Sequence, residues 1–272
     1  MCIELFLTLM KKNSKFKYIY NGIFKNYDQC LKKNQNFFYK EKNYEDKQKK
    51  IIKEIIYCLN KKKQIPSFYK QHTQHLINSI SLLKKKSIKI LDIGGGWGVG
   101  YANILESFSK EKILNIDYYN YDLDNVCNIG EIYFKKKLSF MTKKLRYIKD
   151  LNEVKLNKFD IIFFGSSLQY FKNPIKILEK ILKIKTKYLI FIDLYLVSCT
   201  TFFTNQKHYE SSVPHSFINK NKFLNLVSAK FHLVSSSYSH TMRLNKVGQI
   251  NMKNFPKKYR IENSLNLFFI KK

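Results

Sequence analysis

Residues 90–100, ILDIGGGWGVG, hold five of the nine glycines of the chain within seven positions. An apolar run that ends in Asp92 precedes these glycines, as a short buried strand would. Glycine lets the backbone turn sharply and approach a ligand closely, because it has no side chain. The stretch therefore predicts a strand, a tight turn and a helix, with a binding site at the turn.

Two common phosphate-binding loops do not fit this stretch. A P-loop requires GxxxxGK[ST], and neither Lys-Ser nor Lys-Thr follows the glycines. A dinucleotide-binding loop requires GxGxxG, but Gly94 and Gly96 lead to Val99 where the third glycine would stand. What remains is an acid followed by glycines at every second position, Asp92, Gly94, Gly96 and Gly98. Such an acid would repel a pyrophosphate but can face a positive group, such as the ammonium of a methionine moiety.

Strand-like and helix-like segments alternate from residue 87 onward. The helix-like segments are 102–108, 126–134 and 175–184, and the strand-like segments around them are 87–93, 118–122, 145–151, 159–166 and 187–197. This alternation is typical of parallel βαβ units with right-handed crossovers. The last two strand-like segments, 231–239 and 264–272, have no helical pattern between them and predict an antiparallel end of the sheet.

Residues 1–86 differ from the rest of the chain in being rich in Lys, Asn, Gln and Tyr. Apolar side chains recur at helical spacing in 51–59 and 75–83. We expect residues 1–86 to form a helical N-terminal cap and residues 87–272 to form one α/β domain. The apolar stretch 2–10 is too short to span a bilayer and is expected to pack on this domain.

The formal net charge of +30 would normally indicate a nucleic acid or an anionic membrane surface as partner. However, nearly all of this charge is Lys, and the only arginines are Arg146, Arg243 and Arg260. Proteins that read phosphates and base edges favour the bidentate guanidinium group. Because Lys, Asn, Ile, Tyr and Phe have AT-rich codons, genome composition explains the Lys content at least as well as a ligand does. We therefore expect mostly solvated surface charge, with nucleic acid as the less favoured partner.

The five cysteines stand singly, without a CxxC pair, which indicates neither a zinc site nor a disulfide framework. We therefore expect no metal and a reducing, cytoplasmic location. His72 and His75 are three residues apart on a predicted helix without a third ligand nearby, so a solvated helix face is the favoured interpretation. The longest later apolar run, 188–199, is interrupted by Asp193 and predicts no membrane span.

The acid-and-glycine pattern at the end of the first strand resembles the first motif of class I S-adenosylmethionine-dependent methyltransferases. The resemblance covers about residues 87–272. It implies a Rossmann-like, seven-stranded, mostly parallel sheet with an antiparallel last strand, next to the helical N-terminal cap. It also implies S-adenosylmethionine as cofactor, bound near the first strand by Asp92, Gly94, Gly95, Gly96 and Gly98.

In that family an acid that ends the second strand binds the ribose hydroxyls of the cofactor. The matching position here is Asp122 in YYNYDLDNV, with Asp117 as the alternative. The pair Asp122-Leu123 resembles the start of the DLPxV of many O-methyltransferases, although Asp124 replaces the proline. Asp150 stands where the family places an acid near the adenine amino group.

The segment FDIIFFGSSLQYF resembles the fourth strand of the family, which implies that Ser166, Ser167 and Gln169 face the methyl-transfer pocket. The [DN]PPY motif of adenine amino-group methylation is absent from this position. The chain also lacks the Pro-Cys pair of cytosine carbon-5 methylation. O- or N-methylation of a small molecule or sugar is left as the leading hypothesis.

A narrower likeness rests on NGIFKNYDQC (21–30), GGGWG (94–98), SSLQYFKNP (166–174) and residues 206–216. Together these segments resemble a family of methyltransferases often encoded beside surface-polysaccharide genes. The substrate of that family is not established, so the likeness implies the cofactor and the fold more firmly than the product. It favours a small-molecule or glycan acceptor.

Residues 201–217 follow the fifth predicted strand and are expected to form a loop near the acceptor. This loop carries His208 and His215, and a neutral histidine can serve as general base near pH 7. His215 is the preferred base because Pro214 favours a fixed turn before it. Tyr170 completes the predicted catalytic set. Both histidines can equally be surface residues of the loop.

Several of these residues have structural alternatives. Asp122 and Asp150 can cap a turn or a helix, Trp97 can be a packed aromatic, and the polar residues after the fourth strand can satisfy its end. Two alternative functions stay open: an RNA methyltransferase, favoured only by charge, and a binding protein with this fold but no activity. The intact glycine motif argues against the second. The sequence does not define the oligomeric state.

Overall fold

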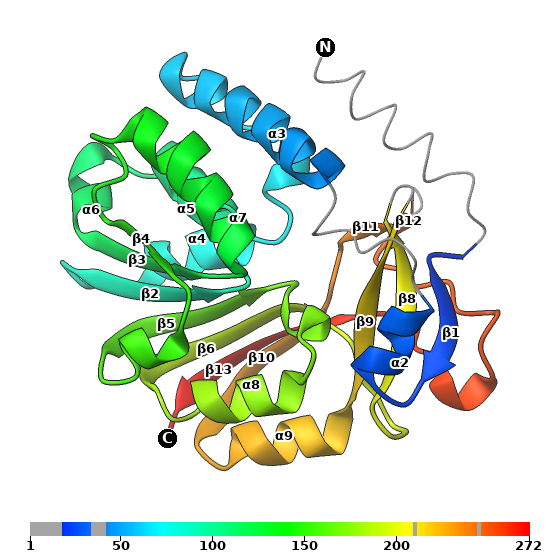
Figure 1. The fold of residues 1–272 in the computed structure, drawn as a ribbon. Coiled ribbons are helices and arrows are strands. Elements are labelled where there is room, and N and C mark those ends of the chain that lie inside the picture. The colour runs from blue at the N-terminus through cyan, green and yellow to red at the C-terminus, as the bar shows by residue number, and fades with distance from the viewer. Residues whose placement is uncertain (1–17, 34–41, 209–210, 244–245) are drawn as a thin grey trace.

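The computed structural model describes residues 18–33, 42–208, 211–243 and 246–272, so the apolar stretch 2–10 lies outside the described residues. Its main element is a seven-stranded sheet with the strand order β10-β13-β6-β5-β2-β3-β4 (Figure 1). The strands are β2 (Ile88–Ile93), β3 (Ile116–Tyr121), β4 (Leu145–Ile148), β5 (Lys158–Gly165), β6 (Lys185–Leu194), β10 (Phe231–Tyr238) and β13 (Leu265–Lys271).

The strands from β2 to β6 are parallel, and the last strand of the chain is antiparallel. β2 pairs in parallel with β3 and β5, and the two outer pairs, β3 with β4 and β5 with β6, are also parallel. β13 lies between β6 and β10 and is antiparallel to both. This confirms the predicted α/β, Rossmann-like sheet with an antiparallel last strand.

Helices cover both faces of the sheet. The longer ones are α3 (Lys42–Asn60), α4 (Gln74–Leu82), α5 (Val99–Ser107), α8 (Pro174–Ile181) and α9 (Lys220–Ser228). The short ones are α2 (Tyr27–Lys32), η2 (Ser67–Tyr69), α6 (Lys110–Leu114), α7 (Asp124–Ile129), the π-helix η3 (Gly130–Lys135), η4 (Lys136–Leu138), η5 (Leu151–Val154), η6 (Leu168–Tyr170) and η7 (Lys257–Tyr259). None of the described helices is long and apolar enough to cross a membrane.

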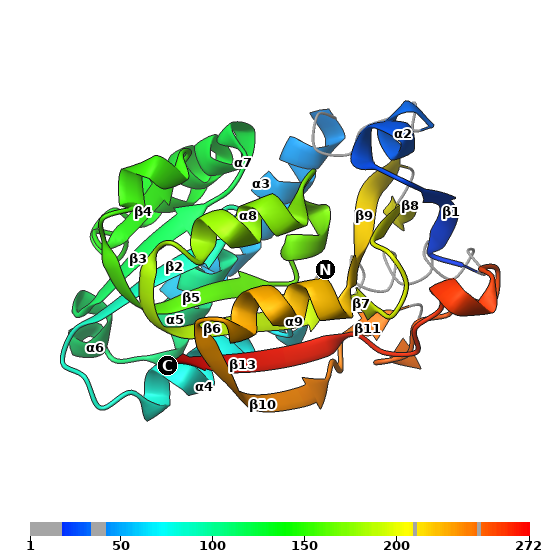
Figure 2. The ribbon, with the colours of Figure 1, turned by 90° about the horizontal axis from the view of Figure 1, so that it is seen from below.

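Neighbouring residues of the central strands are buried on opposite faces of the sheet. Ile90 and Phe163 belong to a cluster with residues of α3, α4 and α5. Leu91 and Phe164, one position further along each strand, belong to a cluster with residues of α8 and α9, and Figure 2 shows these two helices along β5 and β6. Burial on both faces explains why these strands are continuous apolar runs in the sequence.

The N-terminal region combines helices with one strand. The helices predicted at 51–59 and 75–83 are present as α3 and α4. β1 (Tyr20–Phe24) was not predicted, and it pairs with a strand from the second half of the chain. Because α3 and α4 share a hydrophobic cluster with the main sheet, the domain boundary after residue 86 stays a prediction.

A second, four-stranded sheet has the order β1-β8-β9-β7. Its other strands are β8 (Phe202–His208), β9 (Ser211–Asn219) and β7 (Leu196–Val197), and a separate short pair is formed by β11 (Met242–Arg243) and β12 (Lys246–Val247). The prediction of a loop over residues 201–217 is therefore wrong, because this segment is an antiparallel β-hairpin. Pro214 lies within β9 opposite Asn205 and sets no turn before His215.

The predicted single strand 187–197 is divided between the two sheets. β6 ends at Leu194, just after Asp193, which has a φ of +58°. β7 then pairs in parallel with β9 of the second sheet. The sequence shows one apolar run here because both strands are buried.

Aromatic side chains form the core of the second sheet. Phe217 is fully buried and stacks on Phe202, with ring centroids 4.9 Å apart and an interplanar angle of 2°. Tyr20 of β1 packs edge to face on Phe217 at 5.3 Å. Contacts between residues so far apart in the sequence hold β1 on the hairpin.

We expect Phe217→Ala to lower the free energy of unfolding by about 3 to 5 kcal/mol, because it removes a buried ring and leaves a cavity. Urea denaturation followed by circular dichroism measures the effect. Phe140→Ala is the matched control, since the Phe140 ring is 70% exposed, and it should change the free energy of unfolding by less than about 0.5 kcal/mol. Equal urea midpoints for the two variants would show that the second sheet is not held by this core.

Candidate functional site

The glycine loop joins the carboxyl end of β2 to α5, where the strand order of the sheet reverses. Ligands of open α/β sheets bind at such positions. Gly96 and Gly98 have φ values of +62° and +101°, which other residues rarely adopt. A Cβ atom at Gly96 would meet nothing within 4 Å. The loop therefore presents bare backbone to open space, as the close approach of a ligand requires.

Asp92 lies beneath this loop, with only 2% of its surface exposed. The Tyr118 hydroxyl donates a hydrogen bond of 2.5 Å to Asp92 Oδ2. A Cβ atom at Gly95 would lie 2.4 Å from the same oxygen and 2.1 Å from Asn120 Oδ1. Among the described residues, none donates a hydrogen bond to Asp92 Oδ1. A buried acceptor of this kind needs a donor, which a bound ligand or water can supply.

Asp122 directly follows β3 and ties the glycine loop to the end of that strand. Its Oδ2 accepts a hydrogen bond of 2.8 Å from the Gly96 amide, and its Oδ1 accepts one of 2.7 Å from the Leu123 amide. Asn120 Nδ2 also donates a hydrogen bond of 2.7 Å to the Gly96 carbonyl. An ionised carboxylate accepts about four hydrogen bonds, so Asp122 retains capacity for two hydroxyl groups of a ligand.

The two carboxyl groups of the site have raised pKa values. Burial raises the pKa of Asp92 to about 7, the hydrogen bond from Tyr118 lowers it, and the charge of Asp122 raises it further. Burial also raises the pKa of Asp122 to about 6, although the hydrogen bonds from the Leu123 and Gly96 amides lower it. A positive group bound beside these acids would stabilise their charged forms. The site is therefore suited to a cationic ligand.

The other two acids considered from the sequence have structural roles. Asp117 lies near the amino end of β3, away from the glycine loop, and forms an ion pair of 3.2 Å with Lys144. Asp150 follows β4 and caps η5, where it accepts a hydrogen bond of 2.9 Å from the Asn152 amide. Two hydrogen bonds from Asn152 lower the pKa of Asp150. Asp122 is thus the acid at the carboxyl end of β3, whereas Asp150 is a helix cap at the neighbouring strand end.

Three polar residues follow β5 at the same edge of the sheet. Ser166 has a φ of +61° and donates a hydrogen bond of 2.8 Å to Asp193. Ser167 donates to the Ile93 carbonyl at the end of β2. Gln169 is buried, and its Nε2 donates a hydrogen bond of 3.0 Å to Ser166 Oγ. The structure therefore brings these three residues together beside the glycine loop, while Trp97 is a packed aromatic against Phe134.

The predicted catalytic residues lie on the second sheet and next to it. His215 in β9 is fully buried, and its ring packs against the rings of Tyr20, Tyr195, Phe217 and Tyr170. The Tyr170 hydroxyl donates a hydrogen bond of 2.8 Å to Gln206. His208 is the last residue of β8. The structure thus joins Tyr170 and His215 but encloses the histidine in aromatic rings rather than placing it in a loop.

Asp193 is a polar centre that the sequence analysis did not assign to the site. It is buried at the end of β6, where its Oδ2 accepts the Ser166 hydroxyl and its Oδ1 accepts the Ser264 hydroxyl at 2.5 Å. Ser166 and Asp193 both have left-handed backbone conformations at neighbouring strand ends, a kind of strain that is frequent at functional sites. The signal in the sequence was an acid inside an otherwise apolar strand.

The described residues contain no group of three His, Cys, Asp or Glu side chains that could hold a metal ion. His75 Nε2 lies 3.4 Å from Asn266 Nδ2, and His72 Nδ1 lies 3.5 Å from Thr241 Oγ1. The two histidines therefore contact different polar neighbours.

Comparison with protein families gives a match over most of the chain. Residues 67–237 match the family described as "Methyltransferase domain". The chain belongs to this family. It is an enzyme that uses S-adenosylmethionine, as the resemblance of the glycine motif implied. No curated protein matches the sequence of this methyltransferase.

Solved structures with a similar fold are distant in sequence. Magnesium protoporphyrin IX methyltransferase from Synechocystis PCC 6803 is 10% identical, with 75% of this chain and 80% of that chain covered and a TM-score of 0.48. A 1,6-didemethyltoxoflavin-N1-methyltransferase from Burkholderia thailandensis is 12% identical, with 74% and 78% covered and a TM-score of 0.45. A methyltransferase from Clostridium acetobutylicum is 12% identical, with 75% and 91% covered and a TM-score of 0.43.

The site of this methyltransferase fits S-adenosylmethionine on the observations above. A Cβ atom at Gly96 would face open space, Asp122 retains hydrogen-bonding capacity, and Asp92 has an oxygen without a donor among the described residues. The ribose hydroxyls of the cofactor can donate hydrogen bonds to a carboxylate such as Asp122. Its sulfonium and ammonium groups are positively charged and suit a site with two acids. Tyr118 and Asn120, which hold the acid and the loop in place, were not predicted, because their role depends on the pairing of β2 with β3.

We expect Asp92 to make the stability of the methyltransferase depend on pH. Its pKa is about 7 in the folded chain and about 4 in an unfolded one. The unfolded state therefore loses this proton first, and the contribution of Asp92 to the free energy of unfolding falls by about 4 kcal/mol between about pH 4 and pH 7. Asp92→Asn should remove this contribution, so the variant gains stability relative to the original protein as the pH rises. Urea denaturation at several pH values measures the difference, and a constant difference between the two proteins would contradict the assignment.

Proposed function

We propose that this methyltransferase transfers a methyl group to an oxygen or nitrogen atom of a small molecule or sugar of surface-glycan metabolism. The observation that supports this acceptor class is the set of uncharged polar side chains after β5. Ser166 and Gln169 are linked by a hydrogen bond, and Tyr170 is linked to Gln206. Uncharged donors and acceptors suit the hydroxyl and amino groups of such an acceptor.

The proposal assigns the two ends of the cofactor to two parts of the site. Asp92 and the loop residues Gly94, Gly95, Gly96 and Gly98 would hold the methionine end. Asp122, supported by the Leu123 amide, would bind the ribose hydroxyls, and Asp150 would lie toward the adenine. This assignment agrees with the positions of Asp122 and Asp150 after β3 and β4, on the edge of the sheet where β2 meets the glycine loop.

S-adenosylmethionine supplies an electrophilic methyl group on a sulfonium, and transfer of that group is an in-line displacement. The protein must align the acceptor and receive its proton. We assign the acceptor to the space between residues 166–170, the β8–β9 hairpin and the N-terminal region. His215, His208 and Tyr170 are the proposed proton-accepting and positioning residues. The contact between the Tyr170 and His215 rings, with centroids 5.4 Å apart, supports placing these two on one side of the acceptor.

The acceptor class is tested by incubating the enzyme and S-adenosylmethionine with compact hydroxylated or amino compounds, neutral and anionic, and separately with RNA. We expect release of S-adenosylhomocysteine, and gain of a methyl group by mass spectrometry, with members of the small-molecule set only. The net charge of +30 is the one observation that favours RNA. If the enzyme methylates RNA and its RNA binding weakens steeply with salt, the RNA methyltransferase alternative replaces the proposal.

We also propose that an enzyme with this function is located in the cytoplasm.

The role of Asp122 is tested by calorimetric titration with S-adenosylhomocysteine. Asp122→Ala should weaken binding by about ten- to a hundredfold, because charge-assisted hydrogen bonds to two hydroxyls are worth about 1.5 to 3 kcal/mol. Asp117→Ala is the matched control, since Asp117 lies toward the other end of β3 and contacts Lys144, and it should leave the affinity unchanged. NAD should not bind to the original protein. Loss of affinity in Asp117→Ala alone would place the ribose elsewhere.

A further inference from the structure

A buried carboxylate lies behind the polar residues that follow β5. Asp193, at the end of β6, is only 2% exposed. Its Oδ2 accepts hydrogen bonds from the Ser166 hydroxyl at 2.8 Å and the Tyr195 hydroxyl at 3.3 Å, and its Oδ1 accepts one from the Ser264 hydroxyl at 2.5 Å. An ionised carboxylate accepts hydrogen bonds and donates none. Each of these hydroxyl groups therefore directs a proton toward Asp193.

The direction of these hydrogen bonds extends to Gln169. The Ser166 hydroxyl has a single proton, which it donates to Asp193, so its oxygen can only accept a further hydrogen bond. Gln169 Nε2 supplies that hydrogen bond at 3.0 Å. If the amide were turned over, Gln169 Oε1 would face the Ser166 oxygen with no proton between them. Asp193 therefore fixes the Gln169 amide with its oxygen directed away from Ser166.

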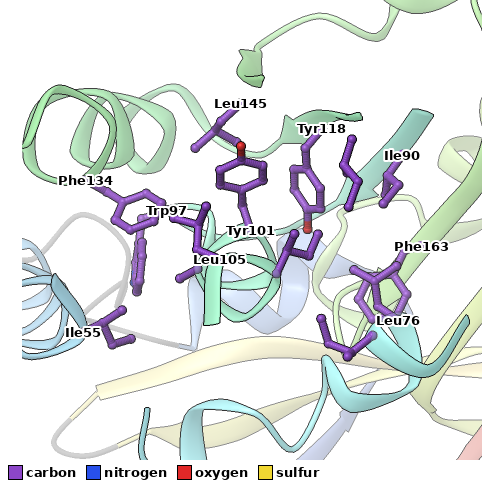
Figure 3. Packing of buried hydrophobic residues seen from close by; sticks show 14 of the residues in the cluster. Ile55, Leu76, Ile90, Trp97, Tyr101, Leu105, Tyr118, Phe134, Leu145 and Phe163 are labelled. Atoms are coloured by element: carbon purple, nitrogen blue, oxygen red, sulfur yellow. The ribbon is translucent and has the colours of Figure 1, made fainter. Parts of the chain in front are cut away.

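The strand ends that carry this chain of hydrogen bonds are held in place by the fold. Phe163 of β5 and Ile90 of β2 belong to one buried cluster, and Figure 3 shows the Phe163 ring among the side chains of this cluster. The Ser166 amide donates a hydrogen bond of 2.9 Å to the Ile192 carbonyl, directly before Asp193. Ser166 and Asp193 therefore keep their positions relative to each other.

The oxygen of the Gln169 amide is a buried acceptor. Gln169 is only 1% exposed, and among the described residues none donates a hydrogen bond to its Oε1. A buried acceptor of this kind needs a donor. Because turning the amide over would break the hydrogen bond to Ser166, the donor must come to Oε1 from a bound molecule or from water.

Gln169 lies between the glycine loop and the hairpin strand β9. On one side, Ser167 donates a hydrogen bond to the Ile93 carbonyl at the end of β2, and a Cβ atom at Gly94 would lie 2.5 Å from Ser167 Cβ. On the other side, the Ser216 hydroxyl in β9 donates a hydrogen bond of 3.1 Å to the Gln169 carbonyl. Gln169 thus lies where the part of the site assigned to the methionine end meets the part assigned to the acceptor.

We propose that Asp193 is a positioning residue, which acts through Ser166 to hold Gln169 Oε1 against the nitrogen atom that receives the methyl group. The inference rests on the proposed function and narrows its acceptor to an amino compound. A neutral amino group has an N–H for Gln169 and a lone pair that stays free to attack. A hydroxyl group has a single proton, and once this proton points at the weakly basic amide oxygen, a stronger base cannot receive it.

The hydrogen bond to Gln169 Oε1 gains strength as the methyl group is transferred. The nitrogen lone pair forms the bond to the methyl carbon, and the electron pair of the broken carbon–sulfur bond stays on the sulfur. The nitrogen becomes positively charged and afterwards gives one proton to water. Because hydrogen bonds from charged donors are stronger, Gln169 stabilises the transition state more than the bound amine.

Calorimetric titration with two cofactor analogues tests the inference. In sinefungin, a carbon that bears an amino group replaces the sulfur of S-adenosylhomocysteine, so the amino group lies where the transferred methyl group would be. Asp193→Asn can donate a hydrogen bond to Ser166 and so reverse the chain, which should weaken sinefungin binding by about ten- to a hundredfold. Gln169→Leu removes the amide oxygen and should cause a similar loss. The affinity for S-adenosylhomocysteine should change by less than about twofold in both variants.

Two further variants separate the orientation of the amide from the charge and the packing of Asp193. Ser166→Ala interrupts the chain without a change in charge and should weaken sinefungin binding selectively, by at least about threefold. Ser264→Ala is the matched control, since it removes a hydroxyl that donates to the same carboxylate through its other oxygen. It should change the affinity for either analogue by less than about twofold. Melting temperatures without ligand report whether each variant is folded.

The outcomes distinguish this inference from the proposed function. Equal losses for the two analogues, or a selective loss in Asp193→Asn without one in Ser166→Ala and Gln169→Leu, would overturn the inference. With the small-molecule set we expect methyl transfer to amino compounds only. Transfer to a compound with hydroxyl groups but no amino group would overturn the inference and leave the proposed function intact. Failure of the original protein to bind S-adenosylhomocysteine would instead overturn the proposed function.

Discussion

The hydrogen bonds from Gly96 to the end of β3 are the constraint on which the site depends. A loop with almost no side chains has little packing of its own to hold its shape. Here the Gly96 amide donates to Asp122 and the Gly96 carbonyl accepts from Asn120, so one peptide unit on each side of Gly96 is bound to the neighbouring strand. The bare backbone can therefore stay open to a ligand and still be ordered, and cofactor binding requires little reorganisation of the loop.

The parts of the fold that were predictable from the sequence are those whose signals are local. The end of β2, the glycine turn and α5 are adjacent in the chain, and the parallel strands are apolar because both faces of the sheet are covered. Asp122 was placed correctly after β3 because it follows a short apolar segment directly. Its hydrogen bonds to the loop and its raised pKa depend on strand pairing and burial, which no local pattern reports.

The parts that the sequence did not reveal depend on partners that are distant along the chain. Residues 201–217 contain polar residues and a proline, which favour a loop, yet they form a hairpin because Tyr20, Phe202 and Phe217 share one core. His215 was predicted from the chemistry of its side chain, and its burial among aromatic rings follows from this tertiary packing. The polar contacts of Asp193 were not predicted for the same reason, since its hydroxyl partners Ser166 and Ser264 come from other parts of the chain.

The pairing of β1 with β8 has a consequence for the order in which the chain can fold. β1 consists of residues 20–24, and the residues that pair with it are 203–206. During synthesis β1 is made early, but its partner strand is among the later parts of the chain. Contacts of such high sequence separation slow folding, because a long loop must close before they form. The second sheet is therefore assembled late, after the strands β2 to β6 of the main sheet have left the ribosome, and until then β1 remains an unpaired strand edge that is open to association with other chains.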